Sequence, residues 1–435
     1  MKSILTLIFI CITCLLYGQK TNKYLDAALL AEKWIQSQEI NKKDSGICWR
    51  NIRDSAISTY DLYSGNSGII LFYLELYHAT KKREYLNKAH QGFKYIQLKS
   101  SSGLNVPDVG LYTGLAGVAY TAYQMYKITG KKHYTAAVVT LINRLAATNI
   151  LAGSIANKFA NDIISGYAGI GLFYLYADQF LPAKNFLPQA KRAGDILLRR
   201  SLPAANGIRW PMFESDTTDG FFMPNFSHGT AGVAYFLATL YERTREKKYL
   251  QAAIKGAEHL RYISNDSGWV YHVEPNGKTR FYLGWCHGPV GTSRLYYKLY
   301  KITGEKRWEE MVKLSANSIM ISGIPEKRTP GFWNNVSQCC GSAGIAEWYL
   351  NLNKCYNNTA YISFSKHVLE DILKRATIDE SGMSWLQAEH RVLPDLLQAQ
   401  TGYMQGASGI GIALLHMYEF ENKRKPLIKL PDNPF

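Results

Sequence analysis

The chain has 435 residues, of which 47% are hydrophobic, and this composition supports a large folded core and excludes an intrinsically disordered protein. The formal net charge is +16 at pH 7, but the Lys and Arg residues lie in short, scattered groups such as 81–83 and 131–132. A nucleic-acid-binding face interleaves basic and aromatic residues. We therefore expect a solvated basic surface with a mild attraction to acidic peptide segments, and no nucleic-acid partner.

The first 18 residues are typical of a signal peptide. Lys2 is followed by the apolar run Ile4–Leu16, and a small residue in Tyr17–Gln19 offers a cleavage point. The run is too short for a membrane-spanning helix, and Cys14 fits the pattern of a lipid anchor poorly. We expect export to the periplasm or the medium, with no transmembrane span after cleavage.

A Gly-x-x-Gly motif followed by an apolar run recurs along the rest of the chain. Each run is apolar nearly all round, which predicts a helix buried on most sides. Two glycines allow the start of such a helix to lie close to a neighbouring backbone. The seven motifs begin at Gly65, Gly114, Gly166, Gly229, Gly288, Gly341 and Gly406.

A second, amphipathic kind of helix is predicted beside these runs, because apolar residues recur three or four positions apart. Examples are 24–38, 84–97, 248–263 and 307–321. Short alternating stretches with aromatic residues predict strand-like loops at one rim. These stretches are Gly46–Trp49, Gly207–Trp210, Gly268–Tyr271 and Gly382–Trp385.

The pattern predicts an all-α fold, a seven-hairpin α/α toroid with an inner and an outer ring of seven helices each. A closed ring is favoured over an open stack, because the first and last copies are as apolar as the middle ones. We expect residues 19–435 to form this single domain, with the starts of the inner helices around one central opening.

The residue before the first glycine of each motif changes character along the chain. The early copies carry hydroxyl groups, which suit helix caps, and the later copies carry imidazole and thiol groups. Chemistry is therefore expected in copies four to six. In chain order these residues are Ser64, Thr113, Ser165, His228, His287, Cys340 and Gln405.

Three cysteines occupy equivalent places in two adjacent copies. Cys286 and Cys339 each lie two residues before the first glycine, and Cys340 lies one residue before it. Three thiols suit one Zn²⁺ ion and leave a fourth position open, which is typical of a catalytic site. Two alternatives are small buried hydrophobic residues and a Cys339–Cys340 disulfide. Cys48 and Cys355 either pair or stay as free thiols.

The motifs 284–288, 339–341 and 228–229, together with the glycine repeat, resemble the lanthionine synthetase C-like family over nearly the whole chain after the signal segment. The resemblance implies a seven-hairpin toroid with one zinc ion in a central cavity. It also implies a cyclase that adds a peptide cysteine thiol to dehydroalanine or dehydrobutyrine, which forms the thioether lanthionine or methyllanthionine.

Carried over residue by residue, the resemblance implies that Cys286 and Cys339 are zinc ligands and that Cys340 replaces the histidine ligand of most members. Some members with a Cys-Cys-Gly motif use three cysteines. His228 matches the catalytic histidine, and Asp162 matches an aspartate near the active site.

Besides Cys340, a second position departs from the pattern of the family. The cyclases place an arginine four residues before the first zinc cysteine, where this chain has Tyr282. The nearest arginine is Arg280. The contacts that position the substrate are therefore expected to differ.

The chemistry expected of the residues agrees with this resemblance. A free cysteine thiol has a pKa of ~8.5, and zinc binding deprotonates it. Addition to the alkene creates an enolate that needs a proton, and His228 is the candidate acid, oriented by Asp162. Alternatively, the histidine satisfies a backbone group and the aspartate caps a helix. His287 could shape the site or hydrogen-bond a metal-bound sulfur.

The expected partner is a dehydrated, cysteine-containing peptide, with dehydration carried out by a separate dehydratase. Two alternatives are the addition of a small thiol such as glutathione, and an exported zinc-bearing protein that binds peptides or acts as a scaffold. Carbohydrate-processing α/α toroids usually have six hairpins and a carboxylate pair, and the motifs of this chain match neither feature.

Overall fold

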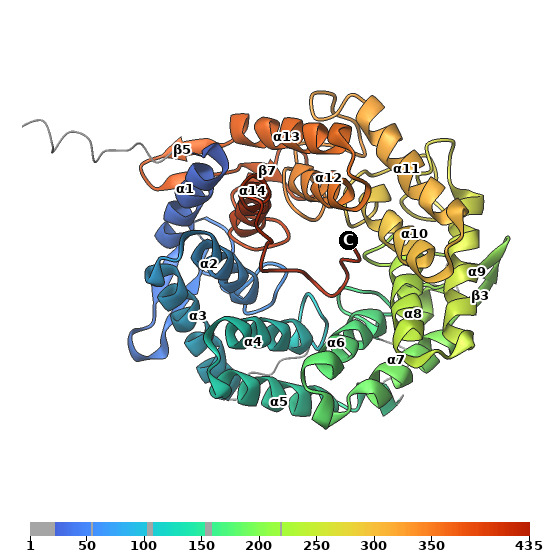
Figure 1. The fold of residues 1–435 in the computed structure, drawn as a ribbon, viewed down its shortest axis with the longest axis horizontal. Coiled ribbons are helices and arrows are strands. Elements are labelled where there is room, and N and C mark those ends of the chain that lie inside the picture. The colour runs from blue at the N-terminus through green and yellow to red at the C-terminus, as the bar shows by residue number, and fades with distance from the viewer. Residues whose placement is uncertain (1–21, 54, 102–107, 153–158, 218–219) are drawn as a thin grey trace, which may run out of the picture.

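The computed structural model describes residues 22–53, 55–101, 108–152, 159–217 and 220–435, so the predicted signal peptide at 1–18 lies outside the described residues. Helices of the described part form two concentric rings (Figure 1). The inner ring contains α2 (Asn66–Thr80), α4 (Leu115–Thr129), α6 (Tyr167–Phe180), α8 (Thr230–Thr244), α10 (Pro289–Thr303), α12 (Ser342–Tyr356) and α14 (Ala407–Glu421). The outer ring contains α1 (Lys23–Ser37), α3 (Arg83–Ser101), α5 (Lys132–Ala147), α7 (Leu187–Arg199), α9 (Lys247–Ile263), α11 (Lys306–Ile321) and α13 (Thr359–Lys374).

The ring closes through the two ends of the described chain. Each inner helix pairs with the outer helix that follows it, except that α14 packs against α1 and also contacts α2. The predicted toroid with seven inner and seven outer helices is confirmed. The inner helices are buried nearly all round, whereas the outer ones alternate buried and exposed residues, as the apolar patterns require.

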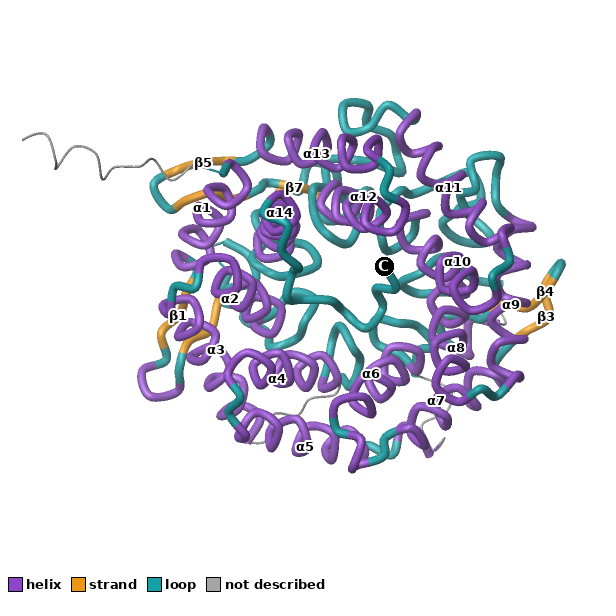
Figure 2. The backbone as a smooth tube through the Cα atoms, in the orientation of Figure 1, coloured by secondary structure: helices purple, strands orange, loops and turns teal. Residues whose placement is uncertain are grey.

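In the described part of the chain, four two-stranded antiparallel hairpins lie beside the helices (Figure 2). Three of the predicted stretches contain a strand, but the prediction for Gly268–Tyr271 is wrong. There Asn265 closes a loop, because its side chain accepts the Trp269 N–H at 3.0 Å and its own N–H donates to the Trp269 carbonyl at 3.0 Å. The hairpins are β1 (Glu39–Asn41) with β2 (Ile47–Trp49), β3 (Leu202–Ala204) with β4 (Gly207–Arg209), β5 (Thr377–Asp379) with β6 (Gly382–Ser384), and β7 (Gln387–Ala388) with β8 (Leu397–Gln398).

A closed circle of backbone hydrogen bonds, here called the backbone belt, joins the segments that precede the seven inner helices. Each segment donates an N–H to the carbonyl of the next segment, and the last segment bonds back to the first. In donor-to-acceptor order the bonds are Tyr63 to Tyr112, Tyr112 to Ile164, Ile163 to Ser227, Ser227 to Cys286, Cys286 to Cys339, Cys339 to Met404 and Met404 to Tyr63.

The second glycine of each motif makes room for this belt. A Cβ atom on Gly291 would collide with the carbonyl oxygen of Trp285, and one on Gly344 would collide with that of Gln338. Both carbonyls belong to residues directly before belt cysteines. The glycine repeat therefore lets the belt lie tightly against the first turn of each inner helix.

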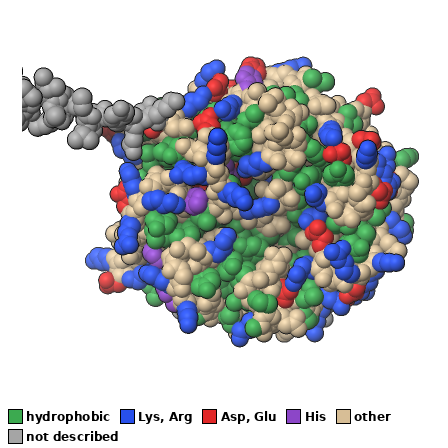
Figure 3. All heavy atoms as spheres, viewed as in Figure 1, with side chains coloured by type: hydrophobic (Ala, Val, Ile, Leu, Met, Phe, Trp, Pro, Cys, Tyr) green, Lys and Arg blue, Asp and Glu red, His purple; other side chains and the backbone are tan. Residues whose placement is uncertain are grey.

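The C-terminal segment crosses the interior of the ring (Figure 1). Asp432 is fully buried there and accepts hydrogen bonds from Trp285 Nε1 at 3.0 Å and from Arg294 Nη1 at 3.2 Å. Lys and Arg side chains are spread among other types on the face shown in Figure 3. Among the described helices, none has the length and hydropathy needed to cross a membrane.

Candidate metal centre

The backbone belt brings three cysteine sulfurs together. Cys286 precedes α10, and Cys339 and Cys340 precede α12. The Cys286 N–H donates to the Cys339 carbonyl at 3.1 Å, which fixes the spacing of these two residues. All three Sγ atoms lie within 4.8 Å of one another, and the Sγ atoms of Cys286 and Cys340 are 3.2 Å apart. The three side chains converge as their repeat positions predict.

The five described cysteines are all free thiols, so the structure contains neither the Cys339–Cys340 disulfide nor a bond between Cys48 and Cys355. Cys286 and Cys339 are buried, while Cys340 is partly exposed. Of the three residues, Cys340 is thus the one with a part that reaches solvent.

Polar groups point at the sulfurs, which a purely packing role would not require. The Tyr63 hydroxyl donates to Cys339 Sγ at 3.1 Å. Gln405 Nε2 lies 3.8 Å from Cys340 Sγ and donates to the Tyr63 hydroxyl at 3.0 Å. Donors of this kind stabilise negative charge on sulfur and orient metal ligands.

The surroundings shift the pKa values of the three thiols in different directions. Burial raises the pKa of the Cys286 and Cys339 thiols, while hydrogen bonds from these two thiols lower the pKa of Cys340. Zinc prefers thiolate ligands in a four-coordinate arrangement, and three converging cysteine sulfurs supply three of the four positions. The residues present therefore fit a zinc ion.

His228 and Asp162 form a hydrogen-bonded pair across two adjacent hairpins. His228 Nδ1 lies 2.7 Å from Asp162 Oδ2. The Asp162 side chain is fully buried, whereas 24% of the His228 side chain is exposed. A carboxylate in this position accepts the Nδ1–H and leaves Nε2 free for a substrate. The structure therefore brings together the two residues that the sequence singled out.

The prediction that the early hydroxyls cap helices is wrong for Ser64 and Ser165. Gly65 and Gly166 are the N-cap residues of α2 and α6, without a side-chain cap. The Ser165 N–H and hydroxyl instead donate to Asp162 Oδ1 at 2.9 Å and 3.3 Å. Those contacts orient the Asp162 carboxylate through Oδ1 and leave Oδ2 for His228. The helices need no hydroxyl cap, because carbonyls of the preceding loop accept their first N–H groups, as Thr59 does for Asn66 and Ala160 does for Tyr167.

Asn225 holds His287 in the way that Asp162 holds His228. The Asn225 Oδ1 and His287 Nδ1 atoms are 2.7 Å apart, and Asn225 Nδ2 donates to the His272 carbonyl at 2.9 Å. Burial lowers the pKa of His287 well below its usual range, and His272 and His228 add to this effect. His287 is therefore neutral, with its proton on Nδ1. Asn225 lies four residues before Gly229, just as Asp162 lies four residues before Gly166. This shared position is the sequence signal that could have identified Asn225.

His228, His272 and His287 lie together and are here called the histidine cluster. The ring of Tyr282 contacts this cluster, and a second ring and an arginine contact Tyr282. The Tyr282 ring centroid lies 4.6 Å from that of His272, 5.4 Å from that of His287 and 5.4 Å from that of Trp333. Arg391 Nε donates to the Tyr282 hydroxyl at 2.9 Å. Arg391, in the loop between β7 and β8, thus contacts Tyr282. Tyr282 occupies the position at which the resemblance implies an arginine.

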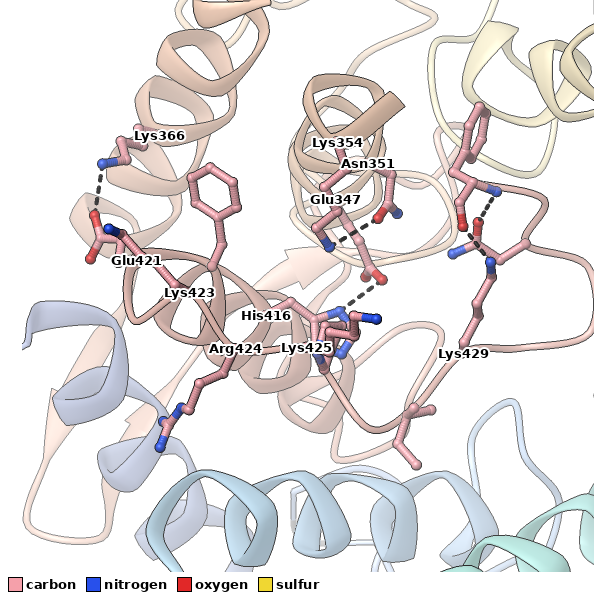
Figure 4. Close-up of a pocket in the computed structure, with 15 residues that line it drawn as sticks. Glu347, Asn351, Lys354, Lys366, His416, Glu421, Lys423, Arg424, Lys425 and Lys429 are labelled. Carbon is pink, nitrogen blue, oxygen red and sulfur yellow. Dashed lines mark hydrogen bonds and ion pairs between the residues drawn. The ribbon is translucent and has the colours of Figure 1, made fainter. Parts of the chain in front are cut away.

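A cavity with a volume of about 1070 Å³ lies elsewhere, beside α12, α14 and the C-terminal segment (Figure 4). Its wall includes Glu347 and His416 and no cysteine. His416 lies between two carboxylates, 3.0 Å from Glu347 and 2.9 Å from Glu75. Burial alone would lower the pKa of His416, but the two carboxylates raise it to about 9. This buried triad is separate from the sulfur cluster.

Comparisons with known proteins agree with this geometry. A family model described as "Lanthionine synthetase C-like protein" matches residues 56–430. The structure of nisin cyclase superposes with a TM-score of 0.63 at 18% identity, covering 93% of this chain and 95% of that chain.

Two other solved structures share the fold. The Lin0763 protein from Listeria innocua has a TM-score of 0.53 at 14% identity, covering 92% of this chain and 99% of that one. An alpha-1,6-mannanase of Salegentibacter sp. HEL1_6 has a TM-score of 0.51 at 11% identity, covering 91% and 99%. At such identities, these likenesses show the α/α toroid alone.

Proposed function

The chain belongs to the lanthionine synthetase C-like family, and on that premise we propose that it is a zinc-dependent cyclase that adds a peptide cysteine thiol to dehydroalanine or dehydrobutyrine. The observation that carries this proposal is the convergence of three cysteine sulfurs within 4.8 Å of one another. The His228 ring centroid lies 5.8 Å from that of His287, the residue after Cys286, so the pair of His228 and Asp162 offers a route for the proton.

Cys286, Cys339 and Cys340 would hold the zinc ion, with Tyr63 and Gln405 donating to two of the sulfurs. When bound, zinc supplies a Lewis acid that keeps a substrate thiol deprotonated at neutral pH. The three-cysteine set makes the site electron-rich, because each ligand carries a negative charge. The partly exposed Cys340 marks the side from which a peptide approaches.

His228 supplies the proton that completes the addition. The sulfur forms a bond to Cβ of the dehydroamino acid, the alkene π bond breaks, and negative charge collects on the enolate. His228 delivers a proton from Nε2 to Cα, while Asp162 keeps Nδ1 protonated and stabilises the imidazolium. The proton lost by the substrate thiol replaces it, so atoms and charge balance. His287, held neutral by Asn225, shapes the site without carrying this proton.

We further propose that the protein works after export on a peptide dehydrated by a separate enzyme. Residues 1–18 support export, and the described residues are assigned to the toroid and its hairpins. The substrate must then meet the protein outside the cytoplasm.

Metal analysis followed by incubation with a dehydrated, cysteine-containing peptide tests the function. We expect one zinc ion per chain and loss of the alkylatable thiol of the peptide without a change in peptide mass. Cys286→Ala should lose both zinc and activity. Cys355→Ala, which removes a free thiol on α12 outside the cluster, is the matched control and should keep both. Full cyclisation by a chelator-treated, zinc-free protein would refute the proposal.

A further inference from the structure

An exposed apolar surface lies on the segment Gln387–Gln398, here called the leucine hairpin, which comprises β7, β8 and their connecting loop. Large apolar side chains exposed elsewhere in the described chain are mostly single, and such residues need no explanation. A contiguous apolar group indicates a binding surface. On the leucine hairpin the exposed fractions are 70% for Val392, 50% for Leu393, 51% for Leu396 and 44% for Leu397.

The base of the leucine hairpin is built into the wall of the sulfur cluster. Trp333 Nε1 donates to the Ala388 carbonyl at 2.7 Å, and the Val336 N–H donates to Gln387 Oε1 at 2.7 Å. The Ala388 side chain packs with Trp333 and Tyr282, and Cys340 packs against the same group. The position of the hairpin base is therefore fixed relative to Cys340.

Arg391 connects the exposed tip to the histidine cluster. It directly precedes Val392, and its Nε donates to the Tyr282 hydroxyl at 2.9 Å. Tyr282 in turn contacts His272 and His287 through its ring. The loop is also ordered internally, because the Leu396 N–H donates to the Leu393 carbonyl at 3.1 Å. The apolar side chains are thus presented on a shaped loop beside the site.

We propose that the leucine hairpin docks the apolar residues that flank the reacting cysteine or dehydroamino acid of the peptide substrate. This inference rests on the proposed function and deepens it by naming a substrate class, peptides with aliphatic residues next to the ring-forming positions. An extended peptide advances about 3.3 Å per residue, so residues near a thiol at Cys340 come within reach of a hairpin packed on the same wall.

The charges of the hairpin favour a peptide over a lipid surface. Apolar loops that bind anionic membranes carry several cationic flanking residues. This hairpin carries Glu389 and Asp395, and its one guanidinium, on Arg391, is bonded to Tyr282. Such a surface suits a neutral, aliphatic peptide segment.

The test compares two dehydrated, cysteine-containing peptides that differ only in flanking residues, Leu and Val in one and Ser and Gly in the other. The wild-type protein should show a KM about tenfold lower for the aliphatic peptide, the effect of burying a few methylene groups. The double variant Leu393→Ser/Leu396→Ser should lose that preference, with zinc content and kcat unchanged. Ile321→Ser, on the outer helix α11 and 85% exposed, is the matched control and should keep the preference.

Fluorescence anisotropy with the unmodified, serine-containing versions of both peptides measures docking without turnover. Aliphatic-peptide binding that is lost in the double variant supports docking on the leucine hairpin, and this readout does not depend on thioether formation, so a failure of docking is distinguished from a failure of the proposed function. Equal binding of both peptides to the wild type, or an unchanged preference in the double variant, overturns the inference. Binding to phosphatidylglycerol vesicles that depends on Leu393 and Leu396, with peptide binding unaffected, overturns it in favour of a membrane surface.

Discussion

Replacement of Asp162 by Asn should slow cyclisation without removing zinc. Ser165 donates its N–H to Asp162 Oδ1 at 2.9 Å, and His228 Nδ1 lies 2.7 Å from Oδ2. In Asp162→Asn the carboxamide oxygen takes the serine donor, which turns the NH₂ group toward His228. Nδ1 must then accept a hydrogen bond, so the imidazolium form loses its partner.

The magnitude follows from the buried hydrogen bond. A hydrogen bond to a charged group contributes about 1.5–3 kcal/mol, and Asp162 is fully buried, so little solvent screening reduces this value. If that stabilisation is present when His228 carries the proton, its loss lowers kcat about 10- to 150-fold. KM should change little, because the pair does not hold the peptide.

The assay follows the peptide thiol by alkylation and mass spectrometry at saturating peptide, with zinc measured in the same samples. Asp61→Asn is the matched control. Asp61 accepts the Ser64 N–H at 2.7 Å and its hydroxyl at 3.3 Å, as Asp162 does with Ser165, but the structure gives Asp61 no histidine partner among the described residues. The control should keep kcat within about twofold, because in the described part of the chain Asp61 has no such histidine to orient.

The reasoning fails if Asp162→Asn keeps the wild-type kcat, or if Asp61→Asn slows the reaction as much. In the first case His228 does not act through the buried carboxylate. In the second case the aspartate only stabilises the loop before its helix.

Two further predictions concern the ligands and the core. Tyr63→Phe removes the hydroxyl that donates to Cys339 Sγ and should weaken zinc binding about tenfold in a chelator competition. The melting temperature of the zinc-free protein should not change. An unchanged zinc affinity would show that this hydrogen bond does not support the ligand. His416→Ala removes the histidine that lies between the buried carboxylates of Glu75 and Glu347 and should lower the free energy of unfolding by about 3–5 kcal/mol in denaturant. Because the pKa of His416 is raised from 6.5 to about 9, its stabilisation is present below pH 6.5 and lost as the pH rises to about 9. The wild-type melting temperature should therefore fall over that range more than that of His416→Ala, and parallel curves would contradict the assignment.

The fold and the sulfur cluster were predictable because both follow from the position of residues within the repeated Gly-x-x-Gly motif. The second glycine of each motif faces a carbonyl next to the belt, so equivalent positions in sequence become equivalent positions around the ring. Cys286 and Cys339 occupy the same position in neighbouring copies, which is sufficient to place them side by side. The same logic would have paired Asn225 with His287.

Other parts of the site could not be predicted, because they rest on contacts between segments outside the repeat. Arg391 and Tyr282 are 109 residues apart, and neither the hairpin that carries Arg391 nor the loop that carries His272 belongs to a Gly-x-x-Gly motif. Asp432 reaches Trp285 from the C-terminal segment across 147 residues. No periodic pattern links such residues.

The backbone belt is a closed ring, so a change in one hairpin affects all the others. In an open solenoid a hairpin can be lost or gained with only local effect, because each unit touches only its neighbours. Here every segment is both donor and acceptor in a loop without ends, so removal of one unit would force the remaining bonds to a tighter curvature. Cys286 and Cys339 are consecutive links in that loop. The number of hairpins is thereby tied to the distance between the sulfurs, and repeat number in this architecture becomes a condition for binding the ion.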